Sequence, residues 1–286
     1  MQKTIRNSVS YSGIGLHSGA EVKINFKPGS ADSGIIFRRI DLKNCPQIKA
    51  NPDSVVSTNR STSIGRKKND NFFSVKTIEH IMAVLWGMDI DNIVIEINGP
   101  EFPIADGSGF PLVELIKKGR VKTLNFARKI KVIENSLWKT GQEEQIVILP
   151  YNGFKINYTL DFDHPLITTQ FYEFDANEDS FIKEIAKART FGFVSELEFL
   201  QENGLAQGGS LNNAILIGEK EIKNTLRFPD ELVRHKVLDI IGDLYLNGFI
   251  RGQIIAIKSG HSSQVELSKE IYKNIGESST VVASVK

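Results

Sequence analysis

The chain has 286 residues, which is long enough for two domains. Hydrophobic residues make up 41% and charged residues 24%, as in ordinary soluble globular proteins, and a formal net charge of +1 argues against nucleic-acid binding. A single cysteine, Cys45, excludes an intrachain disulfide framework. We expect no signal peptide, because no apolar core follows the first basic residues, and no transmembrane segment, because no apolar run approaches roughly 20 residues.

The first part of the chain predicts strands, followed by helix, strand and helix. Alternating apolar and polar residues indicate the strands, and glycines at the ends of apolar periodic segments indicate where the helices stop. The predicted elements are strands at 22–26, 34–37 and 92–98 and helices at 74–86 and 110–118.

The second part repeats this order. Its predicted strands lie at 129–133, 145–149, 154–160 and 252–258, with a hairpin turn at 139–141, and its predicted helices lie at 180–187, 194–201, 229–246 and 264–274. Strands followed by helices indicate an α+β fold. We therefore predict two similar sheet-and-helix sandwich domains, at residues 1–124 and 125–286, packed face to face with the functional site between them.

The predicted helix at 229–246 carries a line of polar residues. His235, Asp239 and Asp243 follow one another at intervals of four, so they stack on one side of the helix. His235 and Asp239 offer nitrogen and oxygen ligands of the kind that zinc accepts. A solvated polar face explains the same spacing, so the metal hypothesis needs support from elsewhere in the chain.

A second histidine lies on the helix that the element order places opposite the first. His80 could supply a third ligand, and its neighbour Glu79 could take a proton from water, as a carboxylate beside a ligand histidine does in zinc hydrolases. A pair of surface residues explains the same two positions equally well.

Two further segments carry groups that could take part in catalysis. His261 follows a predicted strand end and could act as a general acid, and Thr190, flanked by Phe191 and Phe193, could stabilise an oxyanion. A loop histidine and ordinary apolar packing are the competing interpretations.

Taken together, these segments resemble the UDP-3-O-acyl-N-acetylglucosamine deacetylases of lipid A biosynthesis. The matching motifs occur in order over nearly the whole chain, which makes the set specific. They are residues 12–19, 77–80, 91–96, 104–108, 150–154, 161–165, 188–193, 205–210, 226–244 and 258–261.

The resemblance implies a zinc-dependent amidase of two α+β domains with its site at their junction. The metal ligands of the family fall on His80, His235 and Asp239. Its general base falls on Glu79, and its general acid falls on His261.

Other roles are carried over in the same way. Asp243 falls on the carboxylate that orients the general acid, and Thr190 falls on the oxyanion donor. Lys236 and Phe191 fall on positions that contact the sugar and diphosphate side of the substrate, and Phe193 begins the segment, to residue 210, that corresponds to the acyl passage.

The departures from the family pattern concern that passage. Ala206 replaces a cysteine found in some relatives, and Val194 and Leu197 vary the wall, which puts the acyl-chain preference in question. His17 and His164 match family positions without an assigned role; we expect His164 to be structural and leave His17 as a residue that could line the site.

The resemblance further implies Zn²⁺ as cofactor and UDP-3-O-acyl-N-acetylglucosamine and water as substrates. We expect a monomer in the cytoplasm, with contact to the inner membrane left open. Three alternatives remain at this point: another zinc amidase or esterase with the same ligands, a nonenzymatic nucleic-acid-binding module, and an inactive relative.

Overall fold

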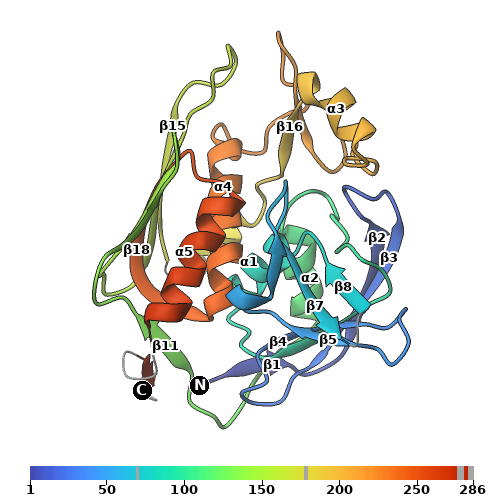
Figure 1. Cartoon of the computed structure of the whole chain (residues 1–286), viewed down its shortest axis with the longest axis vertical. Helices are drawn as coiled ribbons and strands as arrows, with labels where there is room; N and C mark the ends of the chain where they lie inside the picture. The colour runs from blue at the N-terminus through green and yellow to red at the C-terminus, as the bar shows by residue number, and fades with distance from the viewer. Residues whose placement is uncertain (69–70, 177–179, 276–279, 283–286) are drawn as a thin grey trace.

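The computed structural model describes residues 1–68, 71–176, 180–275 and 280–282. Two sheets form the outer layers of the molecule, and the longer helices lie between them (Figure 1). The two halves of the chain therefore face each other through their helices, which confirms the predicted α+β sandwich. The predicted boundary between residues 124 and 125 stays a prediction.

The first half is built on a five-stranded sheet in the order β2-β3-β9-β4-β5. Three further strands form a second sheet, β6-β7-β8, and the chain ends of this half pair as β1-β10. The strands are β1 (Lys3–Ile5), β2 (Val9–Ile14), β3 (Glu21–Pro28), β4 (Ile35–Arg39), β5 (Gln47–Lys49), β6 (Val55–Ser57), β7 (Ser63–Lys68), β8 (Asn71–Val75), β9 (Ile93–Ile97) and β10 (Val121–Thr123), and the helices are η1 (Pro52–Ser54), α1 (Glu79–Gly87) and α2 (Phe110–Gly119).

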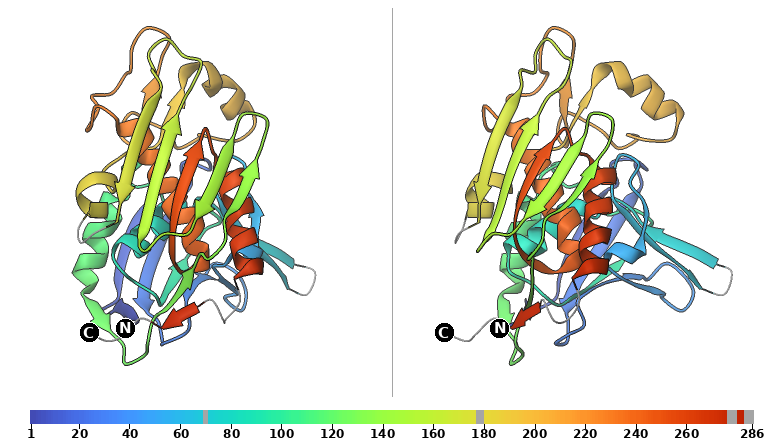
Figure 2. Two further views of the ribbon diagram at one scale, coloured as in Figure 1. Left: turned by 90° about the vertical axis from the view of Figure 1, so that its left-hand side faces the viewer. Right: turned by 60° about the vertical axis from the view of Figure 1, so that its left-hand side comes forward.

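The second half is built on a seven-stranded sheet, which Figure 2 shows from its outer face. Its strands are β11 (Lys129–Val132), β12 (Leu137–Thr140), β13 (Gln145–Leu149), β14 (Phe154–Leu160), β15 (Gln170–Asp175), β18 (Phe249–Ile257) and β19 (Thr280–Val282). Apart from a small unit described below, the helices of this half are the π-helix η2 (Phe181–Ile185), α4 (Glu231–Leu244), η4 (Tyr245–Asn247) and α5 (His261–Asn274).

The two halves share one topology. In the first, β9 pairs parallel with β4 and antiparallel with β3; in the second, β18 pairs parallel with β14 and antiparallel with β13. Each of these strands follows a helix, α1 or α4, and precedes another, α2 or α5. The structure thus confirms the repeated element order that the sequence indicates.

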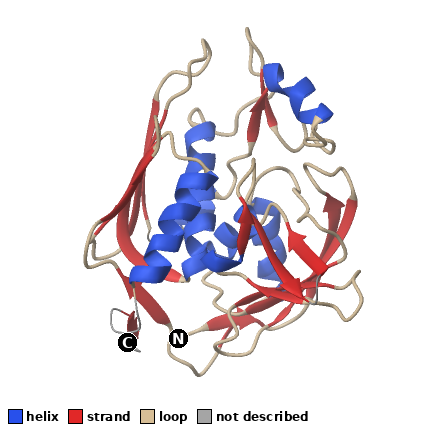
Figure 3. Cartoon of the chain, in the orientation of Figure 1, coloured by secondary structure: helices blue, strands red, loops and turns tan. Residues whose placement is uncertain are grey.

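Helices α1 and α4 pack against each other at the centre of the molecule (Figure 3). The apolar residues predicted for one face of α4 are buried, but so are His235, Asp239 and Asp243, which are at most 3% exposed. The polar line of α4 is therefore an internal surface between the halves. This result contradicts the alternative of a solvated face.

Several predicted boundaries are wrong. The helix predicted at 74–86 begins only at Glu79, because Ser74 and Val75 pair with β7 and Thr77 has a left-handed backbone with φ 59°. Helix α5 begins at His261 and not at residue 264, so His261 belongs to its first turn. The β12–β13 hairpin is confirmed, with its turn at residues 141–144.

A small unit projects beside the upper end of α4 in Figure 1. It contains the parallel pair β16 (Phe191–Phe193) and β17 (Ile215–Ile217), the 3-10 turn η3 (Val194–Glu196) and helix α3 (Leu197–Glu202).

Among the described residues, no helix combines the length and the apolar character needed to cross a membrane.

Candidate active site

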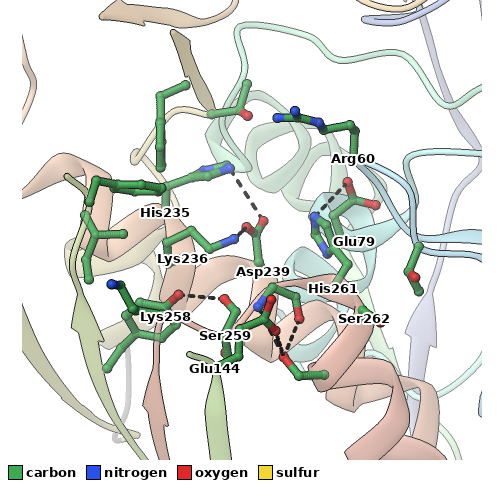
Figure 4. A pocket seen from close by; sticks show the side chains of 18 of the residues that line it. Arg60, Glu79, Glu144, His235, Lys236, Asp239, Lys258, Ser259, His261 and Ser262 are labelled. Carbon is green, nitrogen blue, oxygen red and sulfur yellow. Dashed lines mark hydrogen bonds and ion pairs between the residues drawn. The ribbon is translucent and has the colours of Figure 1, made fainter. Parts of the chain in front are cut away.

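A cleft of about 1050 Å³ opens between the two halves. The first half contributes residues around the start of α1, and the second contributes α4, the β12–β13 turn, β16 and the start of α5 (Figure 4). The cleft is lined by most of the candidates singled out from the sequence: Glu79, His80, Thr190, Phe191, Phe193, His235, Lys236, Asp239 and His261.

His80, His235 and Asp239 meet at the base of this cleft. One ligand atom from each lies within 4.8 Å of the other two. The Asp239 Oδ1 atom is 3.5 Å from His235 Nε2 and 3.9 Å from His80 Nε2, and the two imidazole rings stand at 86° to each other. Three side chains from two helices therefore converge on one point.

The charge states of this trio suit metal binding. Burial, reinforced by His235, lowers the pKa of His80 to about 3, and burial also lowers the pKa of His235. Both imidazoles are therefore neutral near pH 7. Burial opposes the ionisation of Asp239, but the positive charge of Lys236, together with that of the neighbouring histidines, outweighs burial and holds the pKa of that carboxyl well below its ordinary value.

The geometry also fits a divalent cation. His235 Nδ1 lies 3.1 Å from the carbonyl oxygen of Ala188, which fixes Nδ1 as the donor and leaves the lone pair of Nε2 facing Asp239. Asp239 Oδ1 is buried and accepts no hydrogen bond from the described part of the chain. An unpaired carboxylate oxygen facing imidazole lone pairs is costly unless a cation lies between them.

Glu79 lies beside this trio in the first turn of α1. Its Oε2 accepts a hydrogen bond from the backbone amide of Thr62 at 3.0 Å, and its Oε1 is 4.0 Å from His261 Nε2. Burial raises the pKa of Glu79 to about 8, although the charge of His261 opposes the shift. A carboxyl in this state can exchange a proton near neutral pH.

Asp243 contacts the Nδ1 side of the His261 imidazole ring, opposite the Nε2 atom that faces Glu79. The distance from His261 Nδ1 to Asp243 Oδ2 is 2.8 Å, and Asp243 is fully buried. Burial favours neutral His261, but Asp243, together with the carboxylates of Asp239 and Glu79, outweighs burial and raises the pKa of the imidazole to about 9. His261 is therefore a cation near pH 7, with Nε2 on the side of Glu79.

The remaining candidates line the wall of the cleft. Thr190 is anchored through its backbone, which donates to Gly107 and accepts from Ile215, each at 2.8 Å. Phe191 and Phe193 are half-buried and pack edge-to-face on Phe162 at 5.9 and 5.2 Å. They form an apolar wall next to the polar base of the cleft.

Lys236 points toward the trio. Its Nζ donates to Asp239 Oδ2 at 2.7 Å, and this ion pair keeps the pKa of the lysine raised although burial lowers it. Lys258, at the rim, pairs with Glu143 at 3.2 Å and with Asp161 at 3.1 Å. The cleft therefore has one lysine beside the His80, His235 and Asp239 trio and a second lysine at its rim.

The two histidines without an assigned role have different surroundings. His17 lines the cleft and is only 9% exposed. Within the described ranges, its Nε2 atom has no hydrogen-bond partner. His164 lines a separate hollow of about 420 Å³ and packs on Phe193 at 5.4 Å.

Sequence reasoning missed Thr62, which contacts both Glu79 and Asp243. It also missed Arg60, which lines the cleft and pairs with Glu196 from the other half at 2.8 Å. No local pattern distinguishes either residue, because each acts through partners far away in the chain.

Comparison with known proteins gives a consistent result over nearly the whole chain. The family model described as UDP-3-O-acyl N-acetylglycosamine deacetylase matches residues 2–273. Proteins named UDP-3-O-acyl-N-acetylglucosamine deacetylase are similar over most of both chains. That of Citrifermentans bemidjiense is 43% identical over 95% of this chain and 89% of its own. That of Colwellia psychrerythraea is 41% identical over 95% and 90%, and that of Geotalea uraniireducens is 44% identical over 91% and 84%.

Proposed function

Because the chain belongs to the UDP-3-O-acyl N-acetylglycosamine deacetylase family, we propose that it hydrolyses the N-acetyl group of UDP-3-O-acyl-N-acetylglucosamine and releases acetate, as a step of lipid A biosynthesis. We further propose that it is a zinc-dependent, monomeric enzyme of the cytoplasm. The observation that carries the proposal is the buried Asp239 oxygen that faces two neutral histidines beside a carboxyl and an imidazolium.

His80, His235 and Asp239 would hold the zinc ion. When bound, the ion would polarise the acetamide carbonyl and acidify a water molecule at an open position. Lys236 would keep Asp239 ionised through its 2.7 Å contact, and Ala188 would keep His235 in the tautomer that presents Nε2.

Glu79 would act as the general base. Its Oε1 is free to face the cleft because Oε2 is held by the amide of Thr62. As water attacks the carbonyl carbon, Glu79 takes one of its protons. The bond from the water oxygen to carbon forms while the carbonyl π electrons move onto oxygen, which becomes an oxyanion.

Thr190 would stabilise that oxyanion, since it lines the same cleft and its backbone is fixed by two hydrogen bonds. His261 would then donate its Nε2 proton to the sugar nitrogen as the carbon–nitrogen bond breaks. Asp243 stabilises the imidazolium before this transfer and sets the ring orientation. Acetate and a free sugar amine are the products.

The substrate would bind along the cleft in two parts. Lys236 and Phe191 would contact its sugar and diphosphate side, and the acyl chain would follow the segment that begins at Phe193. Phe199 is 61% exposed on α3, so core packing does not explain it, and Leu205 is half-buried nearby in sequence. An apolar passage is consistent with this placement.

The test is acetate release from UDP-3-O-acyl-N-acetylglucosamine by the purified protein, before chelation, after chelation, and after zinc is added back. We expect chelation to abolish release and one equivalent of zinc to restore it. The same assay on UDP-N-acetylglucosamine, which lacks the acyl chain, tests the substrate assignment.

Release that survives complete metal removal would rule out a metal-dependent amidase. Absence of release from the zinc-loaded protein would overturn the deacetylase assignment. Equal turnover of the acylated and non-acylated nucleotides would overturn the acyl passage and favour a different amidase with the same ligands.

A further inference from the structure

Thr62 lies where the two halves meet behind the reacting groups. It is fully buried and immediately precedes β7, in the first half. Its carbonyl oxygen accepts a hydrogen bond from the backbone amide of Ile78, at the start of α1, at 3.2 Å. The backbone of Thr62 is therefore fixed to the helix that carries Glu79.

The amide of Thr62 holds the base. It donates to Glu79 Oε2 at 3.0 Å, so only the second carboxylate oxygen of Glu79 remains to face His261, at 4.0 Å. This contact fixes the plane of the Glu79 carboxylate, because turning that plane away from Thr62 would leave a buried amide unpaired.

The hydroxyl of Thr62 holds the partner of the acid. It donates to Asp243 Oδ1 at 2.6 Å, while Asp243 Oδ2 is 2.8 Å from His261 Nδ1. The same hydroxyl oxygen is 3.4 Å from His261 Nδ1. Both oxygens of a fully buried carboxylate are thus committed, one to the hydroxyl and one to the imidazole.

We propose that Thr62 is a positioning residue that orients both proton-transfer groups, Glu79 through its amide and His261 through Asp243. This inference rests on the proposed function, because it assigns Thr62 a part in that reaction. Its physical content is that the hydroxyl fixes the plane of the Asp243 carboxylate, and the carboxylate fixes the direction of His261 Nε2.

The two contacts can be separated by mutation. Thr62→Val keeps the amide and the side-chain shape but removes the hydroxyl, whereas Thr62→Ser keeps both polar groups. Loss of a hydrogen bond to a charged group corresponds to a fold-change of about 10 to 100. We expect this loss in kcat for Thr62→Val, with KM changed by less than about 3-fold, and recovery in Thr62→Ser.

A merely structural role is distinguished by a double-mutant cycle with Asp243→Ala. If Thr62 acts through Asp243, adding Thr62→Val to Asp243→Ala should lower kcat by less than about 3-fold. Thr4→Val is the matched control, because Thr4 is also a buried threonine, in β1 of the first half, and its hydroxyl accepts a hydrogen bond from the amide of Gly29. Its melting temperature should fall as in Thr62→Val while kcat stays at the wild-type value.

Each outcome bears on one claim. Wild-type kcat in Thr62→Val, or a full multiplicative loss in the double mutant, overturns the positioning role. A similar loss of kcat in Thr4→Val would assign the effect to stability and overturn it as well. Failure of the proposed function is seen separately, as absence of acetate release from the wild-type enzyme.

Discussion

The contact between α1 and α4 can be tested at Gly242. This residue lies in α4 at the point where the helix meets the start of α1, and a Cβ atom there would lie 2.1 Å from the carbonyl oxygen of Glu79 and 3.0 Å from its Cα. Those atoms are backbone, so they cannot rotate away as a flexible side chain would. Gly242→Ala should therefore push the two helices apart by about 1 Å, the shift that restores ordinary van der Waals separation.

The expected magnitude follows from two opposing effects. Glycine to alanine inside a helix normally stabilises by about 1 kcal/mol, whereas overpacking a buried contact costs about 1–3 kcal/mol, and rigid backbone on both sides places this site at the upper end. We expect a net loss of about 2 kcal/mol. Because Glu79 and His80 begin α1 while Asp239 lies on α4, the same displacement should lower kcat by about 100-fold.

Urea denaturation and acetate release measure the two effects. Gly141→Ala serves as the control, because a Cβ there meets nothing closer than 3.5 Å, so unchanged stability is expected within about 0.5 kcal/mol. If Gly242→Ala is as stable as wild type or more stable, and its kcat is unchanged, the close approach of the helices does not set the geometry of the site.

Three further predictions concern single side chains. In metal-free protein, Glu79→Gln should become increasingly stable relative to wild type as the pH rises from 4.5 to about 8. Burial raises the pKa of Glu79 from 4.5 to about 8, so over this range the folded wild-type carboxyl keeps a proton that the unfolded one releases, and wild type loses stability. A difference between the two urea midpoints that is the same at about pH 5 and about pH 8 would contradict this. His261→Ala should lower kcat by about 10²- to 10⁴-fold with one zinc still bound, as metal analysis would show; parallel loss of zinc would make His261 a structural or ligand residue. Phe193→Ala should raise KM for the acylated substrate and leave KM for the non-acylated nucleotide unchanged, and an equal rise for both would argue against the passage.

The features that the sequence predicts well depend on local spacing. The stack of His235, Asp239 and Asp243 follows from the helical repeat alone, and the structure places all three on the inner side of α4. The meeting of His80 with this stack was predicted from the repeated element order, and the shared topology of β9 and β18 explains why that reasoning succeeded.

The features that the sequence did not predict depend on distant contacts. The stretch from Ser74 to Thr77 runs without a break into the helical segment that follows, yet pairing with β7 makes its first part a strand. Thr62 contacts partners 17, 181 and 199 positions away in the chain, so its segment looks like an ordinary turn. The burial of the polar line of α4 likewise depends on α1, which lies more than a hundred residues earlier.

The repeated topology explains why the site needs both halves. Helix α1 supplies Glu79 and His80 from its first turn, where the positive end of the helix dipole favours a carboxylate and disfavours a protonated imidazole. Helix α4 supplies its groups from the middle turns, where a separated second half would expose them to water. The pKa of Glu79 is raised because the carboxyl is buried away from water, and this burial exists only where the two halves pack against each other. The proton-transfer properties of the site are therefore properties of the interface. A substitution at that interface, such as Gly242→Ala, should lower kcat by an amount that reaches the lower end of the range expected for the reacting side chains.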